Sequence, residues 1–262
     1  MTQKERGEAF RAMHEGEAFV IPNPWDAGSA KTMASLGFKA LATTSGGMAF
    51  SLGKMDGQPT LDELAEHVRT IAAATDLPVS VDMENGYGHA PEDVARAINA
   101  VAEAGAVGGS IEDWDREGAL YEIDRAAERI AAAREAADAL DFPFTLTGRA
   151  ENIFRGIGDL DETIARLQAY EAAGADVLFA PRLKTTDQIR AISEATGKPL
   201  NVLGRPDLSM SEMVEAGAHR VSVGSWLSWV GTAAWVDAAE SIRDEGDFSK
   251  LDVRVHPDEW LG

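Results

Sequence analysis

The chain has 262 residues, of which 45% are hydrophobic and 26% are charged, so it can bury a full core and long-range disorder is excluded. It contains 24 Lys and Arg against 44 Asp and Glu, which gives a net charge of −20 at pH 7. Such an acidic surface repels phosphate backbones and anionic lipids, so neither nucleic acid nor a membrane is an expected partner. The chain has no cysteine, which excludes disulfides, thiolate metal sites and a cysteine nucleophile.

The amino-terminal segment also bears on the class of protein. Residues 1–10 are polar and of mixed charge, without the apolar stretch of a secretory signal. The longest apolar runs of the chain are far too short to cross a membrane. We therefore expect a cytoplasmic protein.

Along the chain, helix-like segments repeatedly end in a glycine that a β-rich run follows at once. This happens at Gly37, Gly105, Gly174 and Gly217. Glycine at such a position supplies the left-handed turn that ends a helix. The pattern predicts repeated strand–helix units.

Eight short β-rich runs alternate with these helices, at residues 18–21, 39–43, 78–82, 107–111, 144–149, 176–180, 199–203 and 220–224. Between them, Thr60 and Glu63 form a capping box, and Pro91 suits the first turn of a helix. The order predicts an α/β fold, a (β/α)8 TIM barrel. We expect one domain over residues 1–262, with a C-terminal helical extension from about residue 226. A doubly wound sheet is the structural alternative.

Acidic side chains gather where the predicted strands end. Asp82 and Glu84 follow the third strand, Glu112 follows the fourth, and Asp56 lies in a loop after the second. In such barrels the carboxyl ends of the strands meet at the active site, where several carboxylates need a cation to stay ionised. No His is interleaved, so a hard ion such as Mg²⁺ fits better than zinc. The alternative is that these acids cap helix N-termini.

Arg149, at the end of the fifth strand, is the cation in this predicted site. A guanidinium there can hold a substrate carboxylate or phosphate through paired hydrogen bonds. The alternative is an internal ion pair with Glu112 or Glu151. Ser45, Gly46 and Gly47 after the second strand offer backbone N–H groups for an anionic oxygen.

At these residues the sequence resembles the isocitrate lyase/phosphoenolpyruvate mutase superfamily, over nearly the whole predicted barrel. The most specific part is residues 81–88, Val-Asp-Met-Glu-Asn-Gly-Tyr-Gly. The resemblance implies Mg²⁺, with Mn²⁺ as a substitute, held directly or through water by Asp56, Asp82, Glu84 and Glu112. It implies a 2-oxo acid or its enolate chelated to that metal. The expected substrate-binding residues are Ser45, Gly46, Gly47, Asp82, Arg149 and Asn201. It also implies a homodimer or homotetramer whose subunits exchange their last helix.

The departures from the superfamily narrow the reaction. Its lyases carry a Lys-x-Cys-Gly-His element after the fourth strand, whereas residues 114–121 here contain no Lys, Cys or His. A retro-aldol cleavage needs an acid and a base, but decarboxylation of a β-keto acid needs mainly an electron sink. We therefore expect a Mg²⁺-dependent carbon–carbon lyase or decarboxylase acting on a small 2-oxo or 2-hydroxy carboxylate through a metal-stabilised enolate. The expected catalytic residues are Arg149, Tyr87 and Tyr121, with His89 as a further candidate proton donor.

Two other functions stay open at this point. One is phosphorus chemistry of the phosphonopyruvate hydrolase or phosphoenolpyruvate mutase kind, with Arg149 and Arg182 holding the phosphonate. The other is a non-catalytic protein that binds Mg²⁺ and a keto acid. Turnover distinguishes the lyase and the phosphorus enzyme from the non-catalytic binding protein.

Overall fold

The computed structural model describes residues 1–261 and contains eight parallel strands. They are β1 (Phe19–Ile21), β2 (Leu41–Ala42), β3 (Val79–Asp82), β4 (Gly108–Glu112), β5 (Thr145–Arg149), β6 (Val177–Phe179), β7 (Leu200–Leu203) and β8 (Ala218–Ser222). Their order is β1-β8-β7-β6-β5-β4-β3-β2, and the Ala42 N–H donates to the Pro22 carbonyl at 3.0 Å across the remaining gap. The sheet therefore curls into a barrel. This confirms the predicted (β/α)8 fold and rules out the doubly wound sheet.

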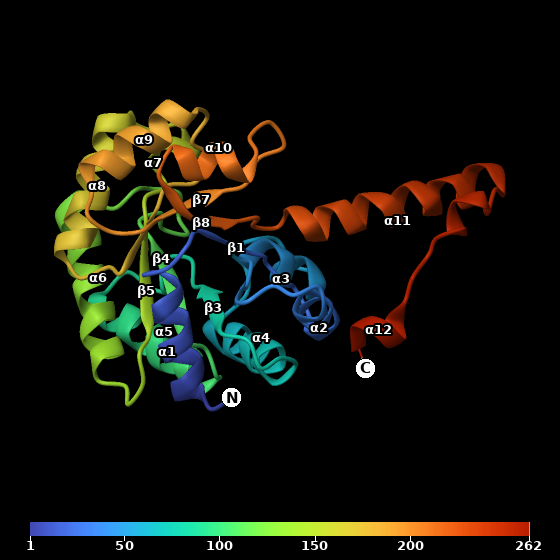
Figure 1. The fold of residues 1–262 in the computed structure, drawn as a ribbon, viewed down its shortest axis with the longest axis horizontal. Helices are drawn as coiled ribbons and strands as arrows, with labels where there is room; N and C mark the ends of the chain where they lie inside the picture. The colour runs from blue at the N-terminus through green and yellow to red at the C-terminus, as the bar shows by residue number, and fades with distance from the viewer. Residues whose placement is uncertain (262) are drawn as a thin grey trace.

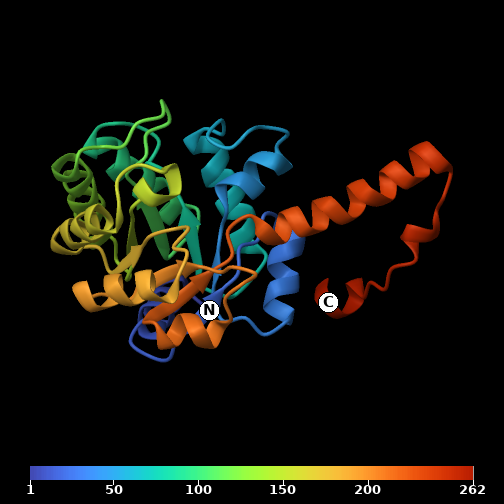
Figure 2. The ribbon, with the colours of Figure 1, turned by 90° about the horizontal axis from the view of Figure 1, so that it is seen from above.

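Helices separate the strands and surround the barrel (Figures 1 and 2). They are α1 (Gln3–Met13), α2 (Ala27–Ser35), α3 (Ser45–Ser51), α4 (Leu61–Ala73), α5 (Pro91–Glu103), α6 (Ile123–Asp138), α7 (Asn152–Arg155), α8 (Leu160–Ala172), α9 (Thr186–Ala195), α10 (Met210–Glu215), α11 (Trp226–Glu245) and α12 (Pro257–Leu261), with a short 3-10 helix η1 (Ser249–Leu251). The capping box of Thr60 and Glu63 opens α4, and Pro91 is the first residue of α5, as predicted.

The glycine pattern has the expected backbone cause. Gly37, Gly105, Gly174 and Gly217 all adopt positive φ angles, from 88° to 107°. Side chains with a Cβ rarely adopt this conformation, so glycine here ends one helix and starts the next strand without strain. The repeated motif is therefore the local signal that divides the barrel into its units.

The apolar core lies between the barrel and its helices, whereas the barrel interior holds polar groups. Helix residues such as Leu64, Val94 and Ile98 are fully buried against the strands. Inside the barrel, Thr147 and Asn201 are also almost fully buried. Successive side chains of a strand point to opposite faces, so each strand contributes to both layers.

The C-terminal segment leaves the barrel. Helix α11 projects away from the strands in Figure 1, and α12 returns to lie beside α2, as Figure 2 also shows. The α11 side chains Trp226, Val230 and Trp235 are each more than half exposed, at 56%, 65% and 56%. Among residues 1–261, every helix is too short or too polar to pass through a lipid bilayer.

Candidate active site

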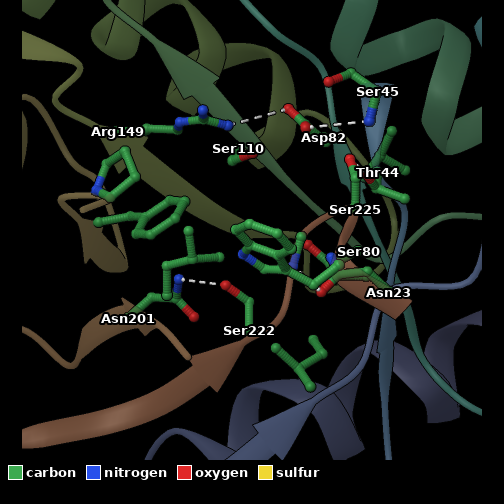
Figure 3. A pocket seen from close by; sticks show the side chains of 18 of the residues that line it. Asn23, Thr44, Ser45, Ser80, Asp82, Ser110, Arg149, Asn201, Ser222 and Ser225 are labelled. Atoms are coloured by element: carbon green, nitrogen blue, oxygen red, sulfur yellow. Dashed lines mark hydrogen bonds and ion pairs between the residues drawn. The ribbon is translucent and has the colours of Figure 1, made fainter. Parts of the chain in front are cut away.

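A cavity of about 320 Å³ opens at the carboxyl ends of the strands (Figure 3). In barrels of this type the active site lies at this face. Asp56, Arg182 and Trp226 are among the residues that line it. Polar side chains of the wall are labelled in Figure 3: Asn23, Thr44, Ser45, Ser80, Asp82, Ser110, Arg149, Asn201, Ser222 and Ser225.

Asp82 is the central carboxylate of the cavity. It ends β3, and its Oδ2 accepts a hydrogen bond from the Ser45 N–H at 3.3 Å, while its Oδ1 accepts one from the Glu84 N–H at 3.3 Å. Asp56 lines the same cavity. Burial raises the pKa of Asp56, and the charge of Asp82 raises it further. The two predicted carboxylates therefore lie near each other, as the sequence led us to expect.

Glu84 lies in the turn after β3 with a positive φ of 48°, a conformation that few residues with a Cβ adopt. Its Oε1 accepts a hydrogen bond from Arg116 Nη2 at 3.0 Å. Burial raises the pKa of Glu84 to about 7; Asp82 and Asp56 add to the shift and Arg116 opposes it. The strained turn thus places the Glu84 carboxylate close enough to Asp82 and Asp56 for their charges to raise its pKa.

Glu112 ends β4 and is buried. Its Oε2 lies 3.4 Å from Arg149 Nη1, and its Oε1 lies 4.0 Å from Arg155 Nη2. Burial raises the pKa of Glu112 well above its usual range, against the effect of Arg149, and Glu151, Asp82 and Glu84 raise it further. The charge of Asp82 therefore raises the pKa of the other three predicted acids, and all four lie at one end of the barrel.

These carboxylates fit a hard divalent cation that keeps much of its water. Within residues 1–261, no three acidic or histidine side chains stand close enough to enclose an ion by themselves. Mg²⁺ is commonly held by one or two carboxylates and several waters, so a dense protein cage is not required. Asp56 and Asp82, which face the cavity, are the first candidates for contact with the ion, with Glu84 and Glu112 behind them.

Arg149 forms the internal ion pairs that were the alternative to substrate binding, and its substrate-binding role stays a prediction. Its Nε donates to Glu151 Oε1 at 2.6 Å, and its Nη1 lies 3.4 Å from Glu112 and 3.6 Å from Asp82. Its guanidinium also lies over the Phe179 ring, 5.3 Å from the centroid. Arg149 is therefore an internal ion-pair partner, and it also lines the cavity where a substrate anion would meet it.

Ser45, Gly46 and Gly47 begin α3. A Cβ on Gly46 would lie 2.8 Å from Ser225 Oγ, and one on Gly47 would lie 2.7 Å from Thr44 Cγ2. Close packing therefore requires both glycines. The Ser45 and Gly47 N–H groups already bond Asp82 and Thr44, so much of the predicted anion nest is used within the chain.

The predicted proton donors lie at different depths. The Tyr87 hydroxyl donates to Glu84 Oε1 at 3.4 Å, and the Arg116 guanidinium lies 4.1 Å from the centroid of the Tyr87 ring. Tyr121 instead bonds Asn85 and His89, at 3.2 and 3.0 Å. Tyr87 is therefore beside the carboxylates, whereas Tyr121 and His89 pair with each other; none of these three residues lines the cavity.

Asp113, the residue after the predicted metal ligand Glu112, supports the site from behind. It is buried; its Oδ1 accepts from the Glu151 N–H at 2.7 Å, and its Oδ2 accepts from Tyr170 at 2.5 Å and Arg166 at 3.1 Å. Glu151 in turn holds Arg149. The sequence also did not predict that Arg116 donates a hydrogen bond to Glu84. The position of Arg116 in the short loop after Glu112 could have indicated this contact.

The sequence profile of the phosphoenolpyruvate phosphomutase family matches residues 10–243. The chain belongs to this family. It is 36% identical to an oxaloacetate decarboxylase of Rhodopseudomonas palustris (strain BisB18) over 236 residues, which cover 85% of this chain and 79% of that relative. These matches confirm the superfamily that the sequence resembled.

Solved structures of family members agree with the fold. A structure from Burkholderia cenocepacia J2315, described only as a lyase/mutase, superposes with a TM-score of 0.95 at 48% identity and covers 98% of this chain and 96% of its own. Oxaloacetate acetylhydrolase in complex with oxalate gives a TM-score of 0.88 at 26% identity, with 98% and 94% covered. The family fold therefore extends over nearly the whole chain.

Proposed function

We propose that this family member is a Mg²⁺-dependent carbon–carbon lyase whose simplest reaction is the decarboxylation of oxaloacetate or a related 2-oxo dicarboxylate. The comparisons bear out the broad class, a carbon–carbon lyase on a small oxo acid. The proposal adds which carbon–carbon bond breaks, the one to the departing carboxylate, and which residues of this chain take part. The observation that carries it is the gathering of Asp56, Asp82, Glu84 and Glu112 at the carboxyl end of the barrel, with Arg149 beside Asp82 and Glu112.

The reaction needs an electron sink and a proton. The bond from C3 to the departing carboxylate breaks, its electron pair passes into the 2-oxo acid, and a proton is then added at C3. Bound at these carboxylates, Mg²⁺ supplies Lewis-acid polarisation of the 2-oxo group. Arg149 is placed to hold the remaining carboxylate through paired hydrogen bonds, since it lines the cavity beside Asp82.

Tyr87 is the best placed of the three predicted proton donors. Its hydroxyl bonds Glu84 within the carboxylate group, and burial raises its pKa, so it stays protonated. Tyr121 is tied to Asn85 and His89 outside the cavity. We therefore assign the proton-donor role to Tyr87 and expect Tyr121→Phe to retain turnover.

A turnover screen of the purified protein, with and without Mg²⁺, tests the proposal. It follows pyruvate, glyoxylate, oxalate and phosphate release from oxaloacetate, isocitrate, methylisocitrate, malate-type acids and phosphonopyruvate. We expect Mg²⁺-dependent pyruvate from oxaloacetate or a related dicarboxylate. Phosphate release would instead support phosphorus chemistry, since a phosphonopyruvate hydrolase is among the similar structures, with a TM-score of 0.84 at 25% identity. Keto-acid binding without turnover would support the non-catalytic binding protein instead.

We further propose that the protein forms a homodimer or homotetramer in which α11 packs on a neighbouring subunit. Its exposed apolar side chains, Trp226, Val230 and Trp235, support this assembly because such a surface is costly in water. Light scattering after size-exclusion chromatography should give a multiple of the chain mass, and Trp235→Glu should reduce it. A wild-type monomer would contradict the proposal.

A further inference from the structure

The cavity does not end at the carboxylates but continues down into the barrel. Ser80 and Asp82 line it from β3, two residues apart and so on the same face of the strand. Below the level of Arg149, the wall includes Ser110, Asn201 and Arg220. Figure 3 labels Ser80, Ser110 and Asn201 in the cavity wall, with no interaction drawn from either serine hydroxyl. Apolar side chains such as Ile21, Ala42 and Val81 complete the cavity wall, so this deep part is a well that contains both polar and apolar groups.

Arg220 lies in this well with a fixed set of neutral partners. Its Nε donates to Asn201 Oδ1 at 2.8 Å, and its Nη2 donates to Thr147 Oγ1 at 3.0 Å. Its Nη1 lies 3.2 Å from His14 Nε2. His14 Nδ1 lies 2.8 Å from the Phe10 carbonyl, which can only accept, so Nδ1 carries the hydrogen and Nε2 accepts from Arg220.

These bonds leave the charge of Arg220 uncompensated. Within residues 1–261, its three hydrogen-bond partners are all uncharged, since burial lowers the pKa of His14 to about 3. The Arg220 residue is only 5% exposed. Burial lowers its pKa to about 9, so it is still a cation at neutral pH. A buried cation without an anion is costly, and each of its two Nη atoms has a second N–H for a further acceptor.

We propose that Arg220 and the hydroxyl groups of Ser80 and Ser110 form a subsite that binds the distal carboxylate of a dicarboxylate, while its 2-oxo acid end lies at Asp82 and Arg149. The inference rests on the proposed function and names the substrate class of the same site.

The spacing of the two ends suits a short diacid. Arg220 contacts Thr147, which precedes Arg149 by two residues of β5, and two residues of a strand span about 6.6 Å. A small diacid can therefore be held at both ends, with one carboxylate at the Arg149 guanidinium and the other at the Arg220 guanidinium. A monocarboxylate of similar length would leave Arg220 without its anion.

This arrangement has a kinetic consequence for decarboxylation. Arg220 stabilises the carboxylate before it departs, but not the neutral CO₂ that it becomes. Its contribution is therefore to binding rather than to the transition state. Replacing it should raise KM for oxaloacetate at least tenfold without lowering kcat. Arg220 is thus a specificity residue.

Calorimetric titrations with Mg²⁺ present test the subsite with four probes. These are oxalate, which has no distal group, 2-oxobutyrate, which has a methyl group there, 3,3-difluorooxaloacetate, with a distal carboxylate, and phosphonopyruvate, with a distal phosphonate. Wild-type protein should bind difluorooxaloacetate at least tenfold more tightly than 2-oxobutyrate. Arg220→Met should remove this difference and leave oxalate affinity within twofold. Arg182→Met removes an exposed arginine of the cavity wall; it tests the competing location of the distal group and should keep the difference. Arg190→Met, in an exposed pair with Asp187 away from the cavity, is the control and should also keep it.

The outcomes separate the inference from the proposed function. If oxalate binds with Mg²⁺ but wild-type protein does not prefer the distal carboxylate, the subsite is refuted and the proposed function stands. This arm needs no variant, so it holds even if Arg220→Met does not fold. Loss of the preference in Arg182→Met alone would place the distal group at Arg182 and also refute it. A stronger preference for phosphonopyruvate would overturn the carboxylate assignment. Failure of oxalate to bind would count against the proposed function itself.

Discussion

Replacing Asp113 should damage both the stability and the activity of the protein, although this residue does not face the cavity. Its side chain is 1% exposed, and Arg166, its ion-pair partner, is 6% exposed. Asp113→Ala removes the acceptor for Arg166, Tyr170 and the Glu151 N–H together. Breaking a buried pair from one side costs about 3–5 kcal/mol, because it leaves a charge buried without its partner.

Asp113→Asn should cost less than Asp113→Ala. The amide oxygen can still accept on one side, but the amide NH2 then faces a donor on the other, so the loss combines one hydrogen bond with the charge opposite Arg166, about 1–3 kcal/mol. Arg166 also keeps Glu162, 2.7 Å from its Nη2. Asp138→Ala is the matched control, because Asp138 pairs with Arg134 at 2.7 Å but is 67% exposed. An exposed pair of this kind contributes about 0–1 kcal/mol.

Urea unfolding at fixed protein concentration, followed by circular dichroism and tryptophan fluorescence, measures these differences. The expected order of stability loss is Asp113→Ala, then Asp113→Asn, then Asp138→Ala. Since Glu151 is held by Asp113 and itself holds Arg149, folded Asp113→Asn should also lose turnover. An Asp113→Ala protein as stable as Asp138→Ala would refute the reasoning.

Two further predictions concern packing and pH. Gly47→Ala should destabilise the protein by about 1–2 kcal/mol through overpacking, because its Cβ would lie 2.7 Å from Thr44 and 3.0 Å from Trp25. Gly28→Ala in α2, whose Cβ would lie 3.5 Å from Asp26, should instead be neutral or stabilising by up to about 1 kcal/mol; urea unfolding that gave both changes the same sign would contradict this. Burial lowers the pKa of His67 to about 4, and the charge of Asp26 opposes this shift. Between pH 6.5 and pH 4, the unfolded chain therefore binds a proton at His67 that the folded chain does not bind. Stability then falls as pH falls, and His67→Leu should gain about 1–2 kcal/mol relative to wild type between pH 7 and pH 5; an equal difference at both pH values would refute the assignment.

The sequence predicted the barrel because its signals are local. Each strand is a short apolar run, and Gly37 or Gly105 marks where a helix ends next to it. The strands proved shorter than predicted where the run continued into a loop; residues 39–43, for example, reduce to β2 (Leu41–Ala42). Asp82 and Arg149 were found because they end strands, and this fold gathers strand ends at one face.

The contacts that support the site could not be predicted in this way. Asp113 meets Arg166 and Tyr170 across 53 and 57 residues, and Arg220 meets His14 across 206. No spacing rule connects positions that only the closed barrel brings together. Tyr121 is the opposite case. It is close to Glu112 in the sequence, but this closeness did not reveal that its hydroxyl bonds His89.

The central claim is that the acidic cluster at the carboxyl end of the barrel supports Mg²⁺-dependent cleavage. Glu112→Gln tests it, because the amide keeps the shape of this buried side chain but removes the negative charge that would hold the cation. Glu128→Gln, in an exposed pair with Arg125, is the control. The most direct measurement is pyruvate release from oxaloacetate by the three proteins, with and without Mg²⁺. We predict Mg²⁺-dependent release by wild type and Glu128→Gln and at least a hundredfold loss in folded Glu112→Gln, about 2.7 kcal/mol of transition-state stabilisation. Undiminished Mg²⁺-dependent release by Glu112→Gln would contradict the account.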